Sequence, residues 1–200
     1  MLKKIFLLSA ILLIANNVFA YEVPKNEEYY KAQIQNQRLL YNATGLINAI
    51  QKGNAEAVDL FMKAGFDPNT SYAGTPALIF AIYQKQPKCV EVLLKAGADP
   101  ETTVPPMFVS ARSMNALTYA INKKSSDMVK SLIESNVDVN KKFNGKYPIN
   151  RALAKKQPVI VEMLLKAGAK PDEKTFKLVK KSKDEYIKDL FANYKDVNEK

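Results

Sequence analysis

Four stretches of this chain spell nearly the same nine residues, and this self-similarity constrains the fold more than any other feature. "VLLKAGADP" occupies residues 92–100, with close copies "LFMKAGFDP" at 60–68 and "MLLKAGAKP" at 163–171. A looser copy, "SLIESNVDV", occupies residues 131–139. Repetition at a fixed period indicates a repeat architecture, in which copies of one supersecondary unit stack in a line.

Two sets of aligned positions give the same period. The copies align on a residue near the end of each unit, and these residues are 32, 39 and 32 positions apart: Gly65, Gly97, Asn136 and Gly168. Nineteen residues before each of them stands an aliphatic residue, followed three residues later by an alanine. The pairs are Leu46 and Ala49, Leu78 and Ala81, Leu117 and Ala120, and Ile149 and Ala152. The chain therefore contains four copies of one unit.

Each copy predicts a pair of helices. Its second half is apolar at positions i, i+3 and i+4, as in "CVEVLLK" (89–95), which gives a helix one wide apolar face. Pro87 and Pro158 suit the first turn of such a helix, where a backbone N–H has no partner to lose. The aligned Gly or Asn supplies the left-handed residue that ends a helix. We expect "KAGADP" to be a helix end followed by a turn and an extended connection.

Both halves of the unit resemble the ankyrin repeat family. "TGLINA", "PALIFA", "NALTYA" and "YPINRA" are similar to the family's T-P-L-H-x-A signature, although the chain has no histidine and must replace or lack one family hydrogen bond. "VEVLLKAGADP" (90–100) is similar to the family's second helix and turn. The resemblance covers residues 44–172 and implies an all-α, ankyrin-type helical repeat solenoid of about four repeats. It also implies a scaffold that binds another protein and catalyses nothing.

The ends of such a stack need capping helices, because a helix pair cannot bury its apolar face alone. "NEEYYKAQIQNQRLLY" (26–41) predicts an amphipathic helix, so we assign residues 21–43 to an N-terminal cap. Residues 44–172 form the repeats, and residues 173–200 form a Lys-rich C-terminal cap of two short helices.

The first twenty residues have the pattern of a secretory signal peptide. Lys3 and Lys4 precede an apolar run at 5–15, and Val18 and Ala20 suit a small-residue cleavage site. The run of eleven apolar residues falls short of the roughly 20 that span a bilayer. We therefore expect residues 1–20 to be removed, leaving an exported, periplasmic or secreted monomer without a transmembrane segment.

The composition argues against an enzyme. With no histidine, the chain lacks the commonest general base, the triads that depend on it and most zinc sites. Its seven glycines form no phosphate-binding or dinucleotide-binding motif. Cys89 occupies a position that the other copies fill with Ala, Met and Ile, which predicts a buried, unreactive thiol. We expect no catalytic residue, no metal and no cofactor. Three aspartates that follow helix ends are predicted to stabilise turns: Asp67, Asp99 and Asp138.

The resemblance places the partner-binding surface on turn tips and on exposed positions of the first helix of each unit. The residues at those places are Tyr72, Tyr83, Gln84, Asn122, Lys123, Phe143 and Lys155, and Phe108 in a long connection between repeats is a further candidate. Tyr83 and Phe143 are the first to test, since aromatic anchors tend to dominate interfaces. Phe80 and Tyr119 lie one turn earlier and are predicted to pack in the structure.

Phe108 belongs to the connection "ETTVPPMFVSARSMN" (101–115), which accounts for the seven extra residues between the second and third copies. Long loops in compact proteins are often functional. This connection either contacts a partner or folds back onto the stack.

The mature chain would carry a formal charge of +8, and residues 141–200 hold sixteen basic against eight acidic side chains. Two alternatives to a general scaffold therefore stay open. One is an inhibitor or immunity-type protein that blocks a secreted enzyme, and the other is a binder of an anionic surface through these lysines. Nucleic acid is not an expected partner, because the chain has no recognition motif for it.

Overall fold

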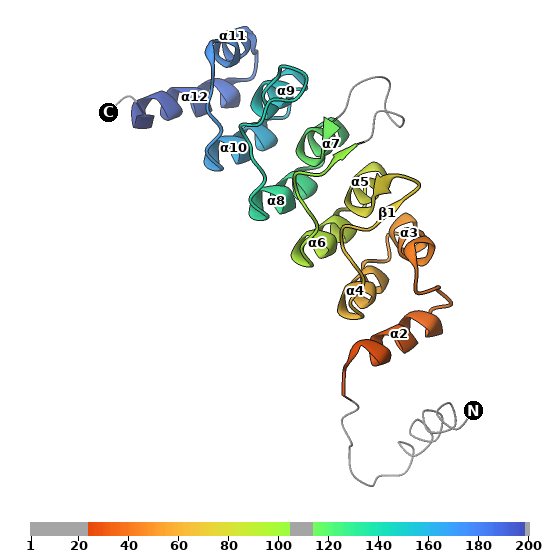
Figure 1. The fold of residues 1–200 in the computed structure, drawn as a ribbon. Helices are drawn as coiled ribbons and strands as arrows, with labels where there is room; N and C mark the ends of the chain where they lie inside the picture. The colour runs from red at the N-terminus through yellow and green to blue at the C-terminus, as the bar shows by residue number, and fades with distance from the viewer. Residues whose placement is uncertain (1–23, 105–113, 199–200) are drawn as a thin grey trace, which may run out of the picture.

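The computed structural model of this chain describes residues 24–104 and 114–198, so the predictions for residues 1–20 and for Phe108 lie outside the described residues. Within them there are eleven helices, and all except α2 run in two rows (Figure 1). The inner row contains α3 (Ala43–Gln51), α5 (Ala77–Tyr83), α7 (Ala116–Lys123), α9 (Pro148–Ala154) and α11 (Glu173–Lys181). The outer row contains α4 (Ala55–Lys63), α6 (Pro87–Lys95), α8 (Ser126–Glu134), α10 (Pro158–Lys166) and α12 (Glu185–Asn198).

Every helix in a row contacts the next helix of that row and its partner in the other row. At the N-terminal end, α2 (Glu27–Asn36) packs against α4, and at the C-terminal end α11 and α12 continue both rows beyond α9 and α10. This sequential packing confirms the predicted all-α helical repeat solenoid.

The aligned residues of the repeat form the core between neighbouring units. The aliphatic residues are at most 2% exposed, and these are Leu46, Leu78, Leu117 and Ile149. The alanines three positions later are 0% exposed, and these are Ala49, Ala81, Ala120 and Ala152. Since alanine adds only a methyl group, it lets adjacent inner helices approach closely while the larger aliphatic residue fills the space beside them. The outer helices contribute equally buried residues at one aligned position: Phe61, Leu93, Leu132 and Leu164.

The predicted helix ends are confirmed. Gly65, Gly97, Asn136 and Gly168 have φ angles of 78°, 94°, 60° and 85°, which is the left-handed conformation that stops an α-helix. The inner helices also end in left-handed residues, at Gly53, Lys85, Lys124 and Lys156, with φ angles of 66°, 56°, 58° and 55°. Three of these four are lysines, which the sequence analysis did not single out as helix ends.

The extended connections also form short hairpins, which the all-α prediction did not include. Strand β1 (Ser71–Tyr72) pairs antiparallel with β2 (Thr75–Pro76), and β3 (Thr103–Val104) pairs with β4 (Met114–Asn115). The β1–β2 turn has positive φ angles at Ala73 and Gly74, as tight two-residue hairpin turns require. At the equivalent place in the fourth unit, Asn144 and Gly145 have the same sign of φ, and a single bridge joins Phe143 to Lys146.

The three aspartates stabilise turns as predicted. The Asp67, Asp99 and Asp138 carboxylates accept the backbone N–H two residues later at 2.8–2.9 Å. This arrangement fixes each turn after its helix end.

The residue that follows each turn then bonds to the next unit. Asn69 donates its Nδ2 to the Gly97 carbonyl at 3.3 Å and accepts the Asp99 N–H at 2.8 Å. Asn140 makes the same pair of bonds, to the Gly168 carbonyl at 3.0 Å and from the Lys170 N–H at 2.8 Å. These side chains therefore join consecutive units through hydrogen bonds as well as through the core.

The middle joint is different. Here Glu101 takes the equivalent place, and its carboxylate accepts the Asp138 N–H at 2.7 Å and the Lys141 ammonium at 2.8 Å. A carboxylate has no N–H to donate, so this joint has an ion pair in place of the second amide hydrogen bond.

Replacing Asn140 with alanine removes both bonds to the next unit. At about 0.5–1.5 kcal/mol per net hydrogen bond, we expect Asn140→Ala to lower the free energy of unfolding by about 1–3 kcal/mol in urea denaturation. Asn36→Ala is the control, because the exposed Asn36 side chain forms no hydrogen bond with any described part of the chain. Equal effects of the two substitutions would show that the turn bonds do not hold the units together.

Candidate partner-binding surface

An exposed aromatic ring and a lysine meet where two inner helices end. Tyr83 is the last residue of α5 and is 56% exposed. Lys123 is the last residue of α7, and its Nζ lies 4.4 Å from the centroid of the Tyr83 ring. The same Nζ lies 5.2 Å from the centroid of the Tyr119 ring. We call Tyr83, Tyr119 and Lys123 the aromatic–lysine cluster.

Within this cluster Lys123 is partly shielded from solvent. Burial lowers the pKa of Lys123 below its ordinary value, and the nearby Lys85 charge lowers it further. Burial likewise raises the pKa of the Tyr119 hydroxyl. A cation over an aromatic face is worth about 0.5–1 kcal/mol at an exposed site, so the two rings orient the lysine. Within the described residues no carboxylate pairs with Lys123, so its N–H donors face solvent or a partner.

Two more of the predicted residues adjoin this cluster. Gln84 follows Tyr83 directly and caps α5, and its side chain is half-buried. Asn122 precedes Lys123, but its Nδ2 lies 3.0 Å from the Met114 sulfur, which ties it to strand β4. The structure therefore brings Tyr83 and Lys123 together from two consecutive units, whereas Gln84 and Asn122 adjoin them only in the sequence. Lys155 holds the matching place at the end of α9, in the next unit along.

The predicted turn-tip residues lie elsewhere. Tyr72 is 41% exposed on β1, and Phe143 is half-buried beside its bridge to Lys146. Strand β2 leads straight into α5, so Tyr72 and Tyr83 lie near opposite ends of a seven-residue helix, about 10 Å apart along its axis. The hairpin tips and the inner-helix ends are thus two separate rows.

Tyr119 was predicted to pack, and it is 9% exposed as expected. Its second role beside Lys123 was missed. The signal was present, since residues four apart on a helix are neighbours and Tyr119 and Lys123 have that spacing.

The described residues contain no cluster of three or more His, Cys, Asp or Glu side chains that could hold a metal ion. None of the helices in this part of the chain is both long and apolar enough to span a bilayer. Cys89 is 1% exposed, which confirms the predicted buried thiol.

The chain was compared with models of known protein families. A family model described as ankyrin repeats (3 copies) matches residues 11–104 and 105–175. A search of curated proteins found no match to the chain.

The buried thiol gives a prediction about stability at high pH. Burial raises the pKa of Cys89 from 9.0 to about 11, because the apolar surroundings disfavour the thiolate. Between these two values the unfolded chain loses the proton while the folded chain keeps it. The stabilisation is therefore complete below pH 9 and is lost as pH rises, by about 2 kcal/mol at pH 11.

The measurement is urea denaturation between pH 8 and 11, comparing the parent chain with Cys89→Ala. The first unit already holds alanine at this position, Ala57, so the substitution suits the fold. The parent should lose more stability than the variant over this range, and parallel curves would contradict the assignment. Tyrosines and lysines that titrate here affect both proteins alike.

Proposed function

Because this chain belongs to the ankyrin repeat family, we propose that it is a non-catalytic scaffold that binds another protein through the aromatic–lysine cluster. The observation that carries the proposal is the ring of Tyr83, which is 56% exposed at a helix end yet held by Lys123 at 4.4 Å. A side chain that is already oriented loses little conformational freedom on binding, so more of its contact energy remains as affinity.

The cluster has the composition of a binding hot spot. Tyr83 offers a large amphipathic surface, and Lys123 offers hydrogen-bond donors that have already lost part of their water. A carbonyl or carboxylate of the partner would replace that water at small additional cost. Gln84 follows Tyr83 in the sequence and Asn122 precedes Lys123. Both add polar groups that exclude or bind water at the rim of the cluster.

The hairpin tips are a second part of the proposed surface. Tyr72 is exposed there. At the tip two units further along, the Lys142 Nζ lies 4.5 Å from the centroid of the Tyr147 ring. Phe143 lies on the same tip. A partner that reaches both rows would contact Tyr72 or Phe143 at one end of an inner helix and Tyr83 or Lys155 at the other.

We further propose that the protein works outside the cytoplasm, in the periplasm or as a secreted monomer. The pattern of residues 1–20 supports this. The single cysteine is compatible with it, because the buried Cys89 thiol is shielded from oxidation.

Truncating Tyr83 should weaken partner binding. Removal of an aromatic hot-spot side chain costs about 2 kcal/mol or more, so we expect roughly thirtyfold weaker binding for Tyr83→Ala. The partner is captured from the extracytoplasmic fraction on immobilised protein, and its affinity is then measured with purified components. Lys123→Ala should weaken the same partner by a smaller factor, and Phe143→Ala tests the hairpin tips.

Tyr186→Ala is the matched control. Tyr186 is 49% exposed, but it lies on α12 in the outer row and donates to Glu162 at 2.6 Å. Circular dichroism should show unchanged helix content in every variant. If Tyr83→Ala and Phe143→Ala both keep the full affinity for every captured partner, the surface is assigned wrongly.

Export has its own test. Mass spectrometry of the protein from fractionated cells should give a chain that begins at Tyr21, recovered outside the cytoplasm. An intact Met1 terminus in the cytoplasmic fraction would contradict the proposed compartment and leave the binding surface unaffected.

A further inference from the structure

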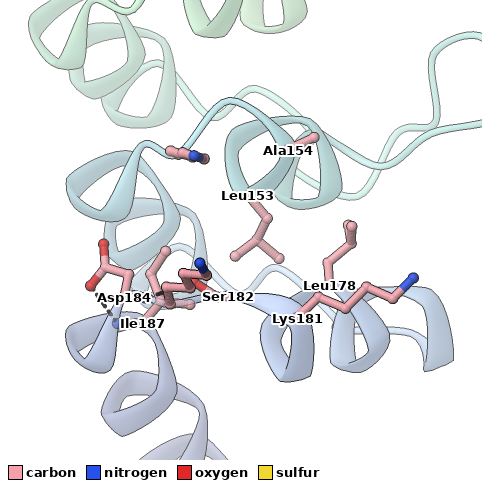
Figure 2. A pocket seen from close by; sticks show the side chains of 9 residues that line it. Leu153, Ala154, Leu178, Lys181, Ser182, Asp184 and Ile187 are labelled. Carbon is pink, nitrogen blue, oxygen red and sulfur yellow. Dashed lines mark hydrogen bonds between the residues drawn. The ribbon is translucent and has the colours of Figure 1, made fainter.

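A pocket lies beyond the fourth helix pair, where α9, α11 and the start of α12 meet (Figure 2). Its volume is about 580 Å³, which is within the range of ligand-binding clefts. The apolar lining comes from Leu153 on α9, Leu178 on α11 and Ile187 on α12. Figure 2 shows Leu153 pointing away from its own helix, toward the ribbons that carry Leu178 and Ile187. The pocket can therefore hold an apolar group.

The same pocket has a positively charged rim. Lys156, Lys181 and Lys183 line it, and within the described residues none of the three forms an ion pair. Asp184 is the carboxylate of this lining, and its Oδ1 accepts the Ile187 N–H at 3.3 Å at the start of α12. The rim thus keeps a net positive charge beside an apolar interior.

Lysines on the outer row behave differently. Lys63, Lys95, Lys130 and Lys166 each pair with an acidic residue four positions away, at 2.6, 2.5, 3.8 and 2.7 Å. These pairs neutralise the outer helices. The surplus charge of the described chain is therefore not spread evenly over the solenoid, and unpaired lysines gather where the inner helices end.

Three of those unpaired lysines occupy one aligned position. Lys85, Lys124 and Lys156 follow α5, α7 and α9, and all three have left-handed backbone. Glycine adopts this conformation with the least strain, and Gly53 does so in the first unit. We call Lys85, Lys124 and Lys156 the lysine edge. It leads along the solenoid to the pocket, because Lys156 belongs to both.

The spacing of the edge suits an extended polypeptide. Packed helices lie roughly 10 Å apart, so successive lysines of the edge repeat at about that distance. A polypeptide in the extended polyproline II conformation rises about 3.1 Å per residue with three residues per turn, so every third residue faces the same side and meets the next lysine. A polypeptide also carries acidic and apolar side chains on one strand, whereas a bilayer presents charged headgroups in a plane.

We propose that the lysine edge and the pocket bind an extended acidic segment of a partner protein. Carboxylates at every third residue pair with the edge, and one large apolar side chain enters the pocket between Leu153, Leu178 and Ile187. The inference builds on the proposed function by naming the chemistry of a partner segment. It uses a surface that does not include Tyr83.

The test uses the purified chain and a fluorescent peptide of about twelve residues, long enough to follow the edge at about 3.1 Å per residue in the polyproline II conformation. The peptide has glutamate at every third position and one tryptophan at the end that would reach the pocket. Binding is followed by fluorescence anisotropy at low ionic strength. A peptide with the same residues but clustered glutamates, and one with alanine for tryptophan, test spacing and the apolar anchor.

Two triple variants that lose the same charge distinguish binding at a specific site from general electrostatic attraction. The rim variant is Lys156→Gln, Lys181→Gln and Lys183→Gln. The control variant is Lys146→Gln, Lys170→Gln and Lys174→Gln, whose lysines are exposed and unpaired in the described chain but lie away from the pocket. We expect the rim variant to bind the peptide roughly tenfold more weakly and the control variant to change little. Leu178→Ser should weaken the tryptophan peptide and leave the alanine peptide unchanged.

Several outcomes overturn the inference. Equal losses in the two triple variants would mean that only net charge matters. Equal binding of the spaced and clustered peptides would exclude the extended register. Anionic phosphatidylglycerol vesicles that bind through the rim lysines, when the peptide does not bind, would assign the site to a membrane surface. The rim lysines and Leu178 lie two or more units beyond Tyr83, so the losses in the rim variant and in Leu178→Ser do not depend on the aromatic–lysine cluster. Failure of the capture experiment at Tyr83 is therefore distinguishable from failure here.

Discussion

No helix pair in this protein is large enough to be stable alone. The helices of the four central pairs are seven to nine residues long, below the length at which an isolated helix holds in water. Each pair becomes stable by burying one face against the next pair, through an alanine that permits close approach and an aliphatic residue that fills the space. The ends are covered by α2, and by α11 and α12. Length, spacing and composition of the repeat all follow from this requirement.

Most of the fold could be predicted from the sequence, because each residue that recurs at an aligned position has one structural role. The glycines end helices, the aspartates fix turns, and the alanines sit in the core, so period and backbone agree. The left-handed lysines at 85, 124 and 156 could not be predicted, because lysine has no preference for that conformation and only the alignment with Gly53 hints at it. Asn144 and Gly145 are a sequence signal for a turn. The strand pairing beside them is a single bridge, which is too short to produce a strand pattern in the sequence.

The candidate site was only partly accessible to the same reasoning. Exposure of Tyr83 follows from its place at a helix end. Its contact with Lys123 depends on how two units are rotated against each other, which is a property of packing and not of either repeat. The charge pattern has the same origin: paired lysines on the outer helices reflect spacing within one helix, whereas the lysine edge exists only because consecutive units are stacked in register. Both proposed surfaces span consecutive units, and a single repeat does not contain them.

The joints between units are held by different kinds of contact, so they respond differently to salt. The Asn69 and Asn140 side-chain amides form hydrogen bonds with the turn of the next unit. These bonds join neutral groups, so dissolved salt scarcely affects them. The joint at Glu101 depends on a carboxylate and on Lys141, whose side chain is 46% exposed, so dissolved salt weakens it. Among these three joints, the one between the second and third units is therefore the one whose connecting contacts depend on ionic strength.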